Sequence, residues 1–498
     1  MESPIVSAAA MRAAEEAAFA SGVEVEALMD RAGQGVAATV RQFFPRPGKA
    51  IVFAGKGHNG GDALVAAARL KQSGWEIDLR VIFPETDCAE LTRKKLADFR
   101  SDETPVGAGR AEARPSALIV LDGLLGLGSK HLLREPIRTA AQEINRLRRE
   151  QNAFVFAVDL PTGFDGDNAD ADPDCVVADC TVAIGFAKHG LVIDSAIDYV
   201  GRLEVVTLTE LAIAASAAND VVACAPALGG LLHRRKFSAY KNEFGRIAVI
   251  AGSPGFVGAA LMTTEGALRS GAGLVELFVP KEIYSIVAAA APAEAMVKPV
   301  RSYRDLLEEK FDVWALGPGL GKSEAKDILR VIERAPAPMV VDADGLNILS
   351  TDVEVLKRCA GPRLLTPHPG EMKRLFDPGK MSRAGTARSF TDAIAVTLLL
   401  KGARTVVAER ERPLSYNCTG NPGMATGGMG DVLTGVCAGL IGQGLSLYDA
   451  ARVGAWSCGR AAEIAIFENG ESEESVLPRH VLINLGRAFT ELQQQASV

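Results

Sequence analysis

The sequence predicts an α/β protein made of two domains in which strands and helices alternate. Short apolar segments that end in glycine, proline or aspartate are separated by helical or loop-like segments of crossover length along the chain. The chain has 498 residues, which is more than one hydrophobic core usually organises. Its 48% hydrophobic and 23% charged residues are typical of an ordinary globular protein and exclude fibrous and disordered classes.

The first predicted domain covers residues 1–215. Apolar residues recur at helical spacing over about residues 11–43, and later apolar runs are typical of buried parallel strands. The expected strands are AIVFAG (50–55), EIDLRVIF (76–83), ALIVLDGLLG (117–126), FVFAVDL (154–160) and CTVAIGF (180–186). This order predicts a Rossmann-like three-layer α/β/α domain. Ligands of such sheets bind at the carboxyl ends of strands, where Gly55, Asp122 and Asp159 fall.

The second predicted domain covers residues 226–498 and is also α/β. Residues 211–230 are rich in small side chains and weakly patterned, which suits a domain boundary. Strand segments then follow at RIAVIAG (246–252), LVELFVP (274–280), DVWALGPGLG (312–321), PMVVDADGLN (338–347), RLLTPHPGE (363–371) and TLLLKGARTVV (397–407).

Composition limits the partners and the compartment. A net charge of −7 argues against a nucleic-acid surface, and no apolar run reaches transmembrane length. The N-terminal stretch has acidic residues and no secretory signal pattern, and the eight cysteines form no CxxC pair. We expect buried thiols in a cytoplasmic protein without nucleic-acid or membrane partners. The acidic segment 163–174 lacks a complete calcium-loop pattern and is interpreted as a solvated turn.

The loop after the first expected strand, GKGHNGGD (55–62), contains a G-x-G-x-x-G pattern. A dinucleotide fingerprint also needs an acidic residue at the end of the next strand, but Asp78 lies inside that strand and Glu85 beyond it. His58, Asn59 and Asp62 are more informative, because a plain phosphate cradle would use only backbone N–H groups. Asp62 is a hydroxyl acceptor, a ligand-positioning group or a helix cap.

Two further strand ends carry carboxylates, Asp122 and Asp159, with Lys130 and Thr162 nearby in the sequence. Turn capping explains any one of them. All of them at one sheet edge predict a site for a polar small molecule, with a monovalent cation as a possible companion.

These segments, with EALMDRAGQG (26–35) upstream, resemble the epimerase domain of the NAD(P)H-hydrate repair enzymes, the YjeF N-terminal family. The resemblance implies K+ ligands at Asn59, Asp122 and Thr162, and a proton-transfer pair, Asp159 and Lys130, that inverts C6 of the hydrate. His58 replaces the first asparagine of the typical family loop. The implied substrate-binding residues are His58, Asn59, Gly60, Gly61, Asp62, Gly126, Leu127, Gly128, Ser129, Lys130, His131, Leu132 and Asp159.

The sharpest motif of the chain is NPGMATGGMGDVLTGVCAGLIGQG (421–444), a glycine-rich loop followed by an aspartate and a helix. Glycine N–H groups and a helix N-terminus together form an anion cradle. Asp431 is then placed to accept a proton from a hydroxyl that attacks a phosphate held there. The alternative is a tight loop capped by Asp431, although capping does not require so many glycines.

Together with GPGLG, DADGLN, LTPHPGEM and LKGARTVV, this motif resembles the ribokinase-like ADP/ATP-dependent NAD(P)H-hydrate dehydratases. The resemblance implies contacts of Ala259, Gly319, His368 and Asp431 with the hydrate. It implies adenine-nucleotide contacts of Lys401, Gly402, Ala403, Arg404, Thr405 and Gly430. Asp342, Asp344 and Asn347 either organise Mg2+ and phosphate or only turn the chain.

The two resemblances imply one bifunctional repair enzyme: one domain interconverts R- and S-NAD(P)H hydrate (NADHX and NADPHX), and the other dehydrates the S form with ADP or ATP. We expect K+ in the first domain, Mg2+ in the second, and a homo-oligomer. A sugar or vitamin kinase on the same C-terminal fold is the alternative enzyme. A scaffold built on the N-terminal fold is the non-enzymatic alternative, and it would not need Asp159, Lys130 or the cation ligands.

Overall fold

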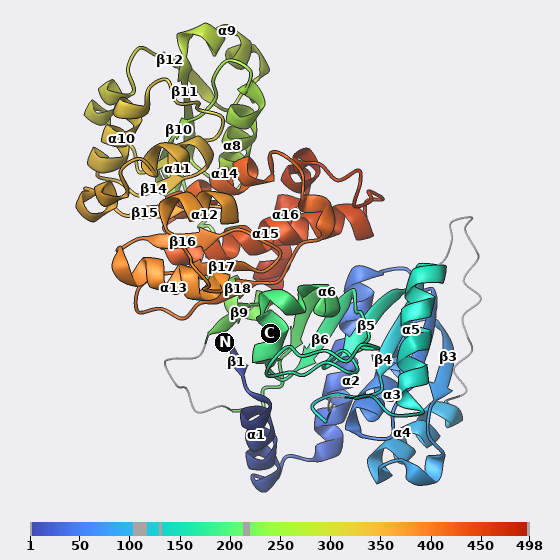
Figure 1. The fold of residues 1–498 in the computed structure, drawn as a ribbon. Coiled ribbons are helices and arrows are strands. Elements are labelled where there is room, and N and C mark those ends of the chain that lie inside the picture. Colours follow the sequence, from blue (N-terminus) through green and yellow to red (C-terminus); the bar gives the residue numbers. More distant parts are fainter. Residues whose placement is uncertain (1, 103–116, 129–131, 213–219, 496–498) are drawn as a thin grey trace. The chain divides into compact units, whose positions relative to one another are not determined.

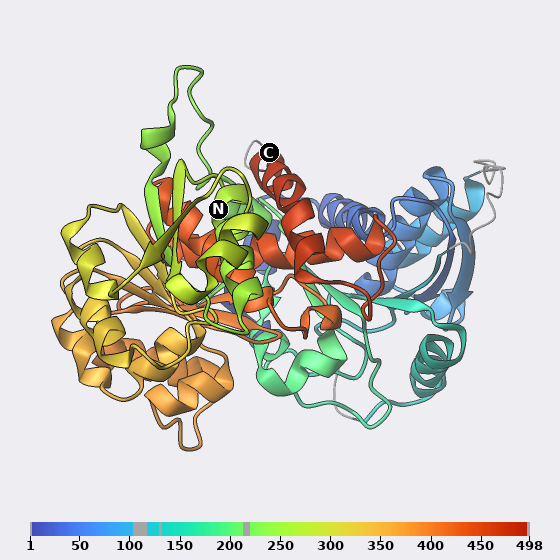
Figure 2. The ribbon, with the colours of Figure 1, turned by 90° about the horizontal axis from the view of Figure 1, so that it is seen from above.

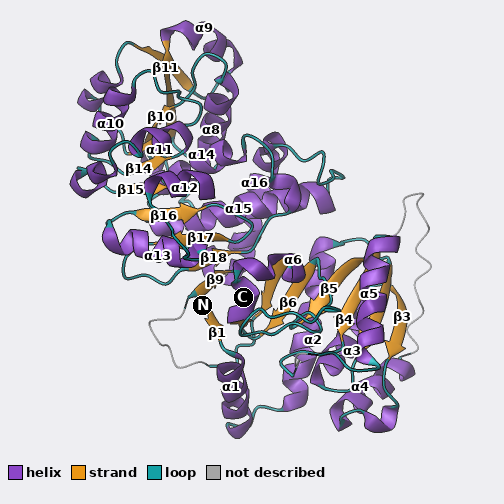
Figure 3. Ribbon diagram, viewed as in Figure 1, coloured by secondary structure: helices purple, strands orange, loops and turns teal. Residues whose placement is uncertain are grey.

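The computed structural model describes residues 2–102, 117–128, 132–212 and 220–495. Contacts divide the chain into two compact units. One unit comprises Ser3–Asn219, and the other comprises Asp220–Val498 together with the first two residues, Met1–Glu2. We call them the N-terminal and C-terminal domains. Strands alternate with helices in each of them (Figures 1 and 3), so the predicted class of two α/β domains is confirmed.

The N-terminal domain is built on a six-stranded parallel sheet in the order β3-β2-β4-β5-β6-β8. A short parallel pair, β1 and β7, belongs to the same domain. The strands are β1 (Ser3–Val6), β2 (Lys49–Ala54), β3 (Glu76–Val81), β4 (Leu118–Gly123), β5 (Phe154–Val158), β6 (Cys180–Ile184), β7 (Ala187–Lys188) and β8 (Arg202–Val206). The helices are α1 (Ala8–Ala20), α2 (Val25–Phe43), α3 (His58–Gln72), α4 (Glu90–Ser101), α5 (Ile137–Gln151) and α6 (Ile197–Val200).

Helices cover both faces of this sheet because successive strand residues point to opposite sides. Ile51 and Val120 pack with Ile144 of α5 on one face. Ala54, three residues after Ile51, packs with Leu64 of α3 on the other. The three-layer arrangement leaves the carboxyl ends of the strands open to a ligand.

The sequence prediction misplaces some elements of this domain. The helical stretch expected over about 11–43 is two helices, because the chain turns at Gly22, whose φ of 95° favours glycine. The short strands β1, β7 and β8 were not predicted.

The C-terminal domain holds strands in the order β12-β11-β10-β13-β14-β15-β16-β17-β18-β9. Neighbours pair in parallel except around β17, which is antiparallel to β16 and β18. The segment 397–407, expected as one strand, is therefore a hairpin whose turn comprises residues 401–404. The strands are β9 (Val221–Ala223), β10 (Arg246–Ile250), β11 (Leu274–Pro280), β12 (Met296–Val300), β13 (Val313–Leu316), β14 (Met339–Val341), β15 (Arg363–Leu365), β16 (Thr397–Leu400), β17 (Thr405–Ala408) and β18 (Ser415–Asn417).

Two buried helices position the glycine-rich motif of this domain. A Cβ placed on Gly435 of α14 would lie 2.0 Å from the Thr263 carbonyl oxygen of α8, so only glycine allows the helices to pack this closely. Helices α15 and α16 also lie alongside each other (Figure 2). The helices are α7 (Ala225–Gly229), α8 (Val257–Arg269), α9 (Lys281–Ala290), α10 (Ala325–Arg334), α11 (Ala343–Leu349), α12 (Pro369–Leu375), α13 (Arg383–Ala393), α14 (Met429–Gly442), α15 (Leu447–Phe467) and α16 (Pro478–Gln495).

Three smaller expectations have clear outcomes. All eight cysteines are free thiols, as predicted. Among the described residues, no helix is both long and apolar enough to cross a membrane. The interpretation of 163–174 as a solvated turn is wrong at Asp172, which is 2% exposed. Its carboxylate accepts hydrogen bonds from the backbone N–H groups of Leu133 and Asp174, both at 2.8 Å, and so anchors the segment.

Candidate functional site

A cavity of about 390 Å³ lies at the carboxyl ends of the N-terminal strands. We call it the N-terminal cavity. Its walls include seven residues predicted from the sequence: His58, Asn59, Asp62, Gly126, Leu127, Gly128 and Asp159. They come from the start of α3, the loop after β4 and the end of β5, so the sheet brings together the strand ends that the sequence singled out.

Of six other predicted substrate-binding residues, three do not line this cavity and three lie outside the described residues. Gly60 and Gly61 are buried in the first turns of α3, and a Cβ on Gly60 would lie 2.0 Å from the Gly55 carbonyl oxygen. Leu132 is 71% exposed and lies outside the cavity wall. Ser129, Lys130 and His131 lie outside the described residues.

Asp62 is not a helix cap. The N-cap of α3 is Gly57, and Asp62 is the fifth residue of the helix. Burial raises the pKa of Asp62 well above its ordinary value, and the negative charges of Asp159 and Glu15 raise it further. The structure therefore leaves the hydroxyl-acceptor and ligand-positioning alternatives for this carboxyl group.

Asp159 has a backbone φ of 65°, a left-handed conformation that is uncommon for aspartate and is often found at functional sites. Its Oδ1 contacts the ammonium group of Lys188 and accepts a hydrogen bond from the Ile184 N–H at 3.1 Å. Its Oδ2 lies on the side of Gly126, where a Cβ would be 3.3 Å away. The carboxylate is thus fixed at one oxygen and presented to the cavity by the other.

Asp122 is completely buried behind this cavity. Its Oδ1 accepts from the Thr162 hydroxyl at 2.7 Å and the Leu124 N–H at 3.3 Å, and its Oδ2 accepts from the Thr162 N–H at 2.8 Å. Burial raises the pKa of Asp122 to about 6, although these hydrogen bonds lower it. Among the described residues, no cationic side chain forms an ion pair with Asp122.

Asn59 completes this polar group from the neighbouring helix. A Cβ on Gly126 would lie 3.1 Å from Asn59 Oδ1, which therefore faces the loop after β4. Among the described residues, the buried Nδ2 donor of Asn59 has no hydrogen-bond partner. The oxygens of the Asp122 carboxylate, the Thr162 hydroxyl and the Asn59 amide are ligand types that a hard cation takes, whereas the Nδ2 donor is not.

Sequence reasoning missed two charged residues at this site, Glu15 of α1 and Lys188 of β7. Glu15 lines the cavity, and burial and the Asp159 charge raise its pKa. Lys188 has no exposed side-chain area. The signal for Lys188 was a lysine within an otherwise apolar run, AIGFAK, but nothing in the sequence identified its partner.

The C-terminal site is centred on Asp431, the third residue of α14. The N-cap of this helix is Gly428, with φ 95°, and no side chain caps it by a hydrogen bond. Burial raises the pKa of Asp431 to about 6, with a further increase from the Asp342 charge, while Lys401 lowers it. A carboxyl group that titrates near neutrality is suited to act as a general base.

Lys401 and Asp342 form a partly buried ion pair beside Asp431. Lys401 Nζ lies 2.7 Å from Asp342 Oδ1, and the Thr434 hydroxyl donates to Asp342 Oδ2 at 2.8 Å. Burial alone would lower the pKa of Lys401. Nearby negative charges, of which Asp342 has the largest effect, raise this pKa above its ordinary value. A Cβ on Gly430 would lie 3.2 Å from Lys401 Nζ, so this glycine leaves room for the ammonium group. Asp342 therefore does more than turn the chain.

His368 caps the following helix, α12. Its Nδ1 accepts from the N–H groups of Gly370 at 3.0 Å and Glu371 at 3.3 Å. In turn, the Glu371 carboxylate accepts a hydrogen bond from the backbone N–H of His368 at 2.9 Å. The His368 side chain is 52% exposed; its Nδ1 holds the start of the helix, and its Nε2 lies 3.5 Å from Glu371 Oε1. The Lys401 N–H donates to the Pro367 carbonyl at 2.8 Å, which brings the ends of β15 and β16 together.

The remaining predicted residues of this domain fall into three groups. Ala259 and Gly319 are neighbours, since a Cβ on Gly319 would lie 2.9 Å from the Ala259 Cβ. In the turn after β16, Gly402 and Ala403 are exposed, whereas Arg404 and Thr405 are buried. Gly402 and Thr405 are joined by reciprocal hydrogen bonds of 3.3 and 3.0 Å through the Thr405 hydroxyl.

Asp344 and Asn347 help to shape the neighbouring backbone. Asp344 Oδ2 accepts from the Gly321 N–H at 2.9 Å, and its Oδ1 accepts from Asn347 Nδ2 at 3.3 Å. Within the described residues, no group of three or more His, Cys, Asp or Glu side chains could hold a metal ion. A dedicated protein cage for Mg2+ is therefore not formed by the residues that the structure describes.

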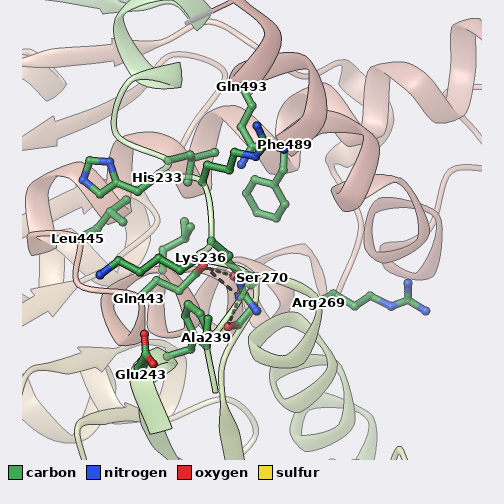
Figure 4. A pocket seen from close by; sticks show the side chains of 16 residues that line it. His233, Lys236, Ala239, Glu243, Arg269, Ser270, Gln443, Leu445, Phe489 and Gln493 are labelled. Carbon is green, nitrogen blue, oxygen red and sulfur yellow. Dashed lines mark hydrogen bonds between the residues drawn. The ribbon is translucent and has the colours of Figure 1, made fainter. Parts of the chain in front are cut away.

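A second cavity, of about 370 Å³, lies elsewhere in the C-terminal domain (Figure 4). Its lining includes Lys236, Arg269, Ser270, Gln443 and Phe489, and none of the residues predicted from the sequence. Figure 4 shows the charged ends of Lys236 and Arg269 directed away from each other, so the cations do not converge on one ligand position.

The fold and the two sites define a bifunctional α/β enzyme that includes a phosphoryl-transfer type of site, with a carboxylate at a glycine-rich helix start beside a lysine. Residues 25–190 match the family described as YjeF-related protein N-terminus, and residues 247–483 match NAD(P)H-hydrate dehydratase. The chain belongs to the family of bifunctional NAD(P)H-hydrate repair enzymes.

Two relatives from bacteria agree with this membership. A bifunctional NAD(P)H-hydrate repair enzyme from Gloeobacter violaceus is 36% identical, covering 88% of this chain and 89% of its own. The Escherichia coli relative of the same name is 34% identical, covering 91% and 88%. A crystal structure of the Bacillus subtilis ADP/ATP-dependent NAD(P)H-hydrate dehydratase, obtained with ATP and Mg2+, is 26% identical, with a TM-score of 0.48 over 55% of this chain and 99% of that one.

Proposed function

We propose that this chain repairs hydrated nicotinamide nucleotides in two steps. The N-terminal domain epimerises R- and S-NAD(P)HX, and the C-terminal domain dehydrates the S form to NAD(P)H with ADP or ATP. The observation that carries the proposal is the match to bifunctional relatives over both domains, each of which has its own buried carboxylate site. We assign the epimerase to residues 1–215 and the dehydratase to residues 226–498.

The dehydration needs activation because hydroxide is a poor leaving group. Asp431 removes the proton of the C6 hydroxyl as that oxygen attacks the terminal phosphoryl group of the nucleotide. The phosphate then leaves, driven by the lone pair of the ring nitrogen, and loss of a proton from C5 to solvent restores the C5=C6 double bond of NAD(P)H. Lys401 lies 2.7 Å from Asp342 and offers its ammonium group to the phosphates at the start of α14.

Nucleotide contacts are assigned to Lys401, Gly402, Ala403, Arg404, Thr405 and Gly430, and hydrate contacts to Ala259, Gly319, His368 and Asp431. Mg2+ neutralises phosphate charge when the nucleotide is bound. Both Asp342 oxygens are engaged by Lys401 and Thr434, and both Asp344 oxygens by Asn347 and Gly321, so the phosphates would supply most of the ligands of the ion.

For the epimerase we assign Asp159 and Lys130 as the proton-transfer pair, facing a hydrate held by the cavity residues and by residues 129–132. K+ is held by Asn59, Asp122 and Thr162. It supplies a positive charge beside a buried carboxylate that otherwise has only hydrogen-bond donors around it.

We further propose a cytoplasmic homo-oligomer. The free, mostly buried thiols suit a reducing compartment. Phe237 is fully exposed and Tyr240 is 61% exposed on one segment of the C-terminal domain, and such apolar side chains are often covered by a second copy.

The direct test of function supplies chemically prepared S- or R-NADHX with either ADP or ATP and Mg2+, and follows NADH absorbance. We expect S-hydrate to be converted with at least one nucleotide, and R-hydrate to be converted through the S form. No recovery with either nucleotide would refute the dehydratase. A stable phosphorylated product in place of NADH would favour the kinase alternative.

The K+ assignment predicts a cation-dependent stability. Replacing K+ with tetramethylammonium should lower the unfolding temperature and slow epimerisation, because an ion that binds only the folded state stabilises it by mass action. S-hydrate repair in the same sample is the control.

The matched variant for this test is Asp122→Asn, which removes the charge but keeps the shape. We expect its unfolding temperature to be insensitive to K+. A K+ response equal to that of the unmodified protein would place the ion elsewhere.

A further inference from the structure

Lys188 forms a buried ion pair that the assigned epimerase residues do not account for. It lies on β7 beside Val6 of β1, and its side chain has no exposed area. Its ammonium group contacts Asp159 Oδ1 and donates to the Ile184 carbonyl oxygen at 3.0 Å. A lysine is almost never fully buried unless it is paired, so this position is committed to Asp159.

This arrangement divides the Asp159 carboxylate into two unequal oxygens. Oδ1 receives both Lys188 Nζ and the Ile184 N–H, which use its acceptor capacity. Oδ2 lies on the side of Gly126 at the cavity wall. A carboxylate anchored in this way cannot rotate, and only one oxygen is available to a substrate.

The surroundings of Asp159 are rich in acidic groups. Glu15 of α1 and Asp62 of α3 share the cavity with it, and burial and then the charge of Asp159 raise the pKa of both. Lys188 opposes these increases at both groups, and Arg12 opposes the increase at Glu15. His58 and Lys56 also line the cavity, from the start of α3 and the loop before it.

We propose that Lys188 is a positioning residue of the epimerase: it anchors Asp159 Oδ1, so that Oδ2 is held toward the cavity and exchanges the proton of the substrate C6 hydroxyl. Lys188 does not itself touch the substrate, because it is wholly buried behind Asp159. This inference rests on the proposed epimerase activity, and it adds Lys188 as the residue that holds the catalytic base, Asp159, in position.

The test compares Lys188→Met, which has similar length without charge, with Lys188→Arg, which keeps the charge. R-hydrate consumption is followed over a range of hydrate concentrations with excess ADP or ATP, and the rate on S-hydrate monitors the C-terminal domain of the same molecules. For Lys188→Met we expect epimerisation at pH 7 to fall by about a hundredfold. The loss should lie in kcat, with KM close to that of the unmodified protein, because the substrate contacts remain while Asp159 Oδ2 is no longer held in place. Lys188→Arg should keep most of the unmodified rate.

The split between kcat and KM separates positioning from a purely structural role. A loss in KM alone, an equal loss in Lys188→Arg and Lys188→Met, or no loss would overturn the proposal. If Lys188→Met does not fold, Lys188→Gln retains a donor without charge and should show the same loss of kcat. An unmodified protein that repairs S-hydrate but never consumes R-hydrate faster than the spontaneous reaction would refute the epimerase function itself.

Discussion

Replacing Asp431 with asparagine should abolish the recovery of NAD(P)H from S-hydrate while nucleotide binding stays close to that of the unmodified protein. A positioned general base contributes about 10²–10⁴-fold to a rate. Asparagine has nearly the same shape and leaves the glycine-rich start of α14 intact, since no side-chain capping bond is lost. The loss should therefore appear in kcat, measured as NADH absorbance at saturating hydrate, and not in nucleotide affinity.

The pH dependence gives this prediction a second readout. The pKa of Asp431 is raised to about 6, mainly by burial and then by Asp342, so the base loses its charge as the pH falls through that value. The rate of the unmodified protein should therefore fall below about pH 6 and level off above it. The small residual rate of Asp431→Asn should not show this transition.

A matched control is Asp449→Asn, at another aspartate in a first helical turn of the same domain. Asp449 bonds to Ser446 and Arg452 and lies in no site assigned here. We expect the control to keep its full rate. An Asp431→Asn variant with unchanged kcat would remove this residue from the chemistry.

Local patterns predicted much of the C-terminal site because its parts are close in sequence. The glycines and Asp431 lie within one short motif, and a glycine-rich loop that opens a helix has few other physical explanations. The residues around Asp431, in contrast, come from distant parts of the sequence. Asp342 and Lys401 are 59 residues apart, and Asp342 and Thr434 are 92 residues apart. Only the order of the strands brings them together.

The N-terminal domain shows the same limit more clearly. The rule that parallel strands present their carboxyl ends at one edge was enough to group Asp122 with Thr162, which the structure joins by two hydrogen bonds. It could not find Lys188, because β7 is two residues long and its pairing with β1 has no sequence pattern. The sequence also could not show whether Asp62 caps a helix, because the answer depends on the exact residue at which α3 begins.

Asp159→Asn should leave R-hydrate unconsumed beyond its spontaneous conversion, while S-hydrate repair continues at the rate of the unmodified protein. The amide cannot accept a proton from the C6 hydroxyl or from the returning water as a carboxylate does, and the expected loss is about 10²–10⁴-fold. Chromatographic separation of the two hydrates over time measures it. Because both activities reside in one chain, the unchanged S-hydrate rate reports the concentration of folded C-terminal domain in the same sample.

The buried pair introduces a stability effect that has to be separated from chemistry. Removing one partner of a buried ion pair destabilises a protein by about 3–5 kcal/mol, because the other charge is left unpaired. Asp159→Asn alone should therefore lower the unfolding temperature of the N-terminal domain. In the double variant Asp159→Asn/Lys188→Met neither charge of this pair remains, so stability should recover by most of that amount. Epimerisation should stay lost in both. Recovery of epimerisation together with stability in the double variant would show that Asp159 acts through the fold and not as the base.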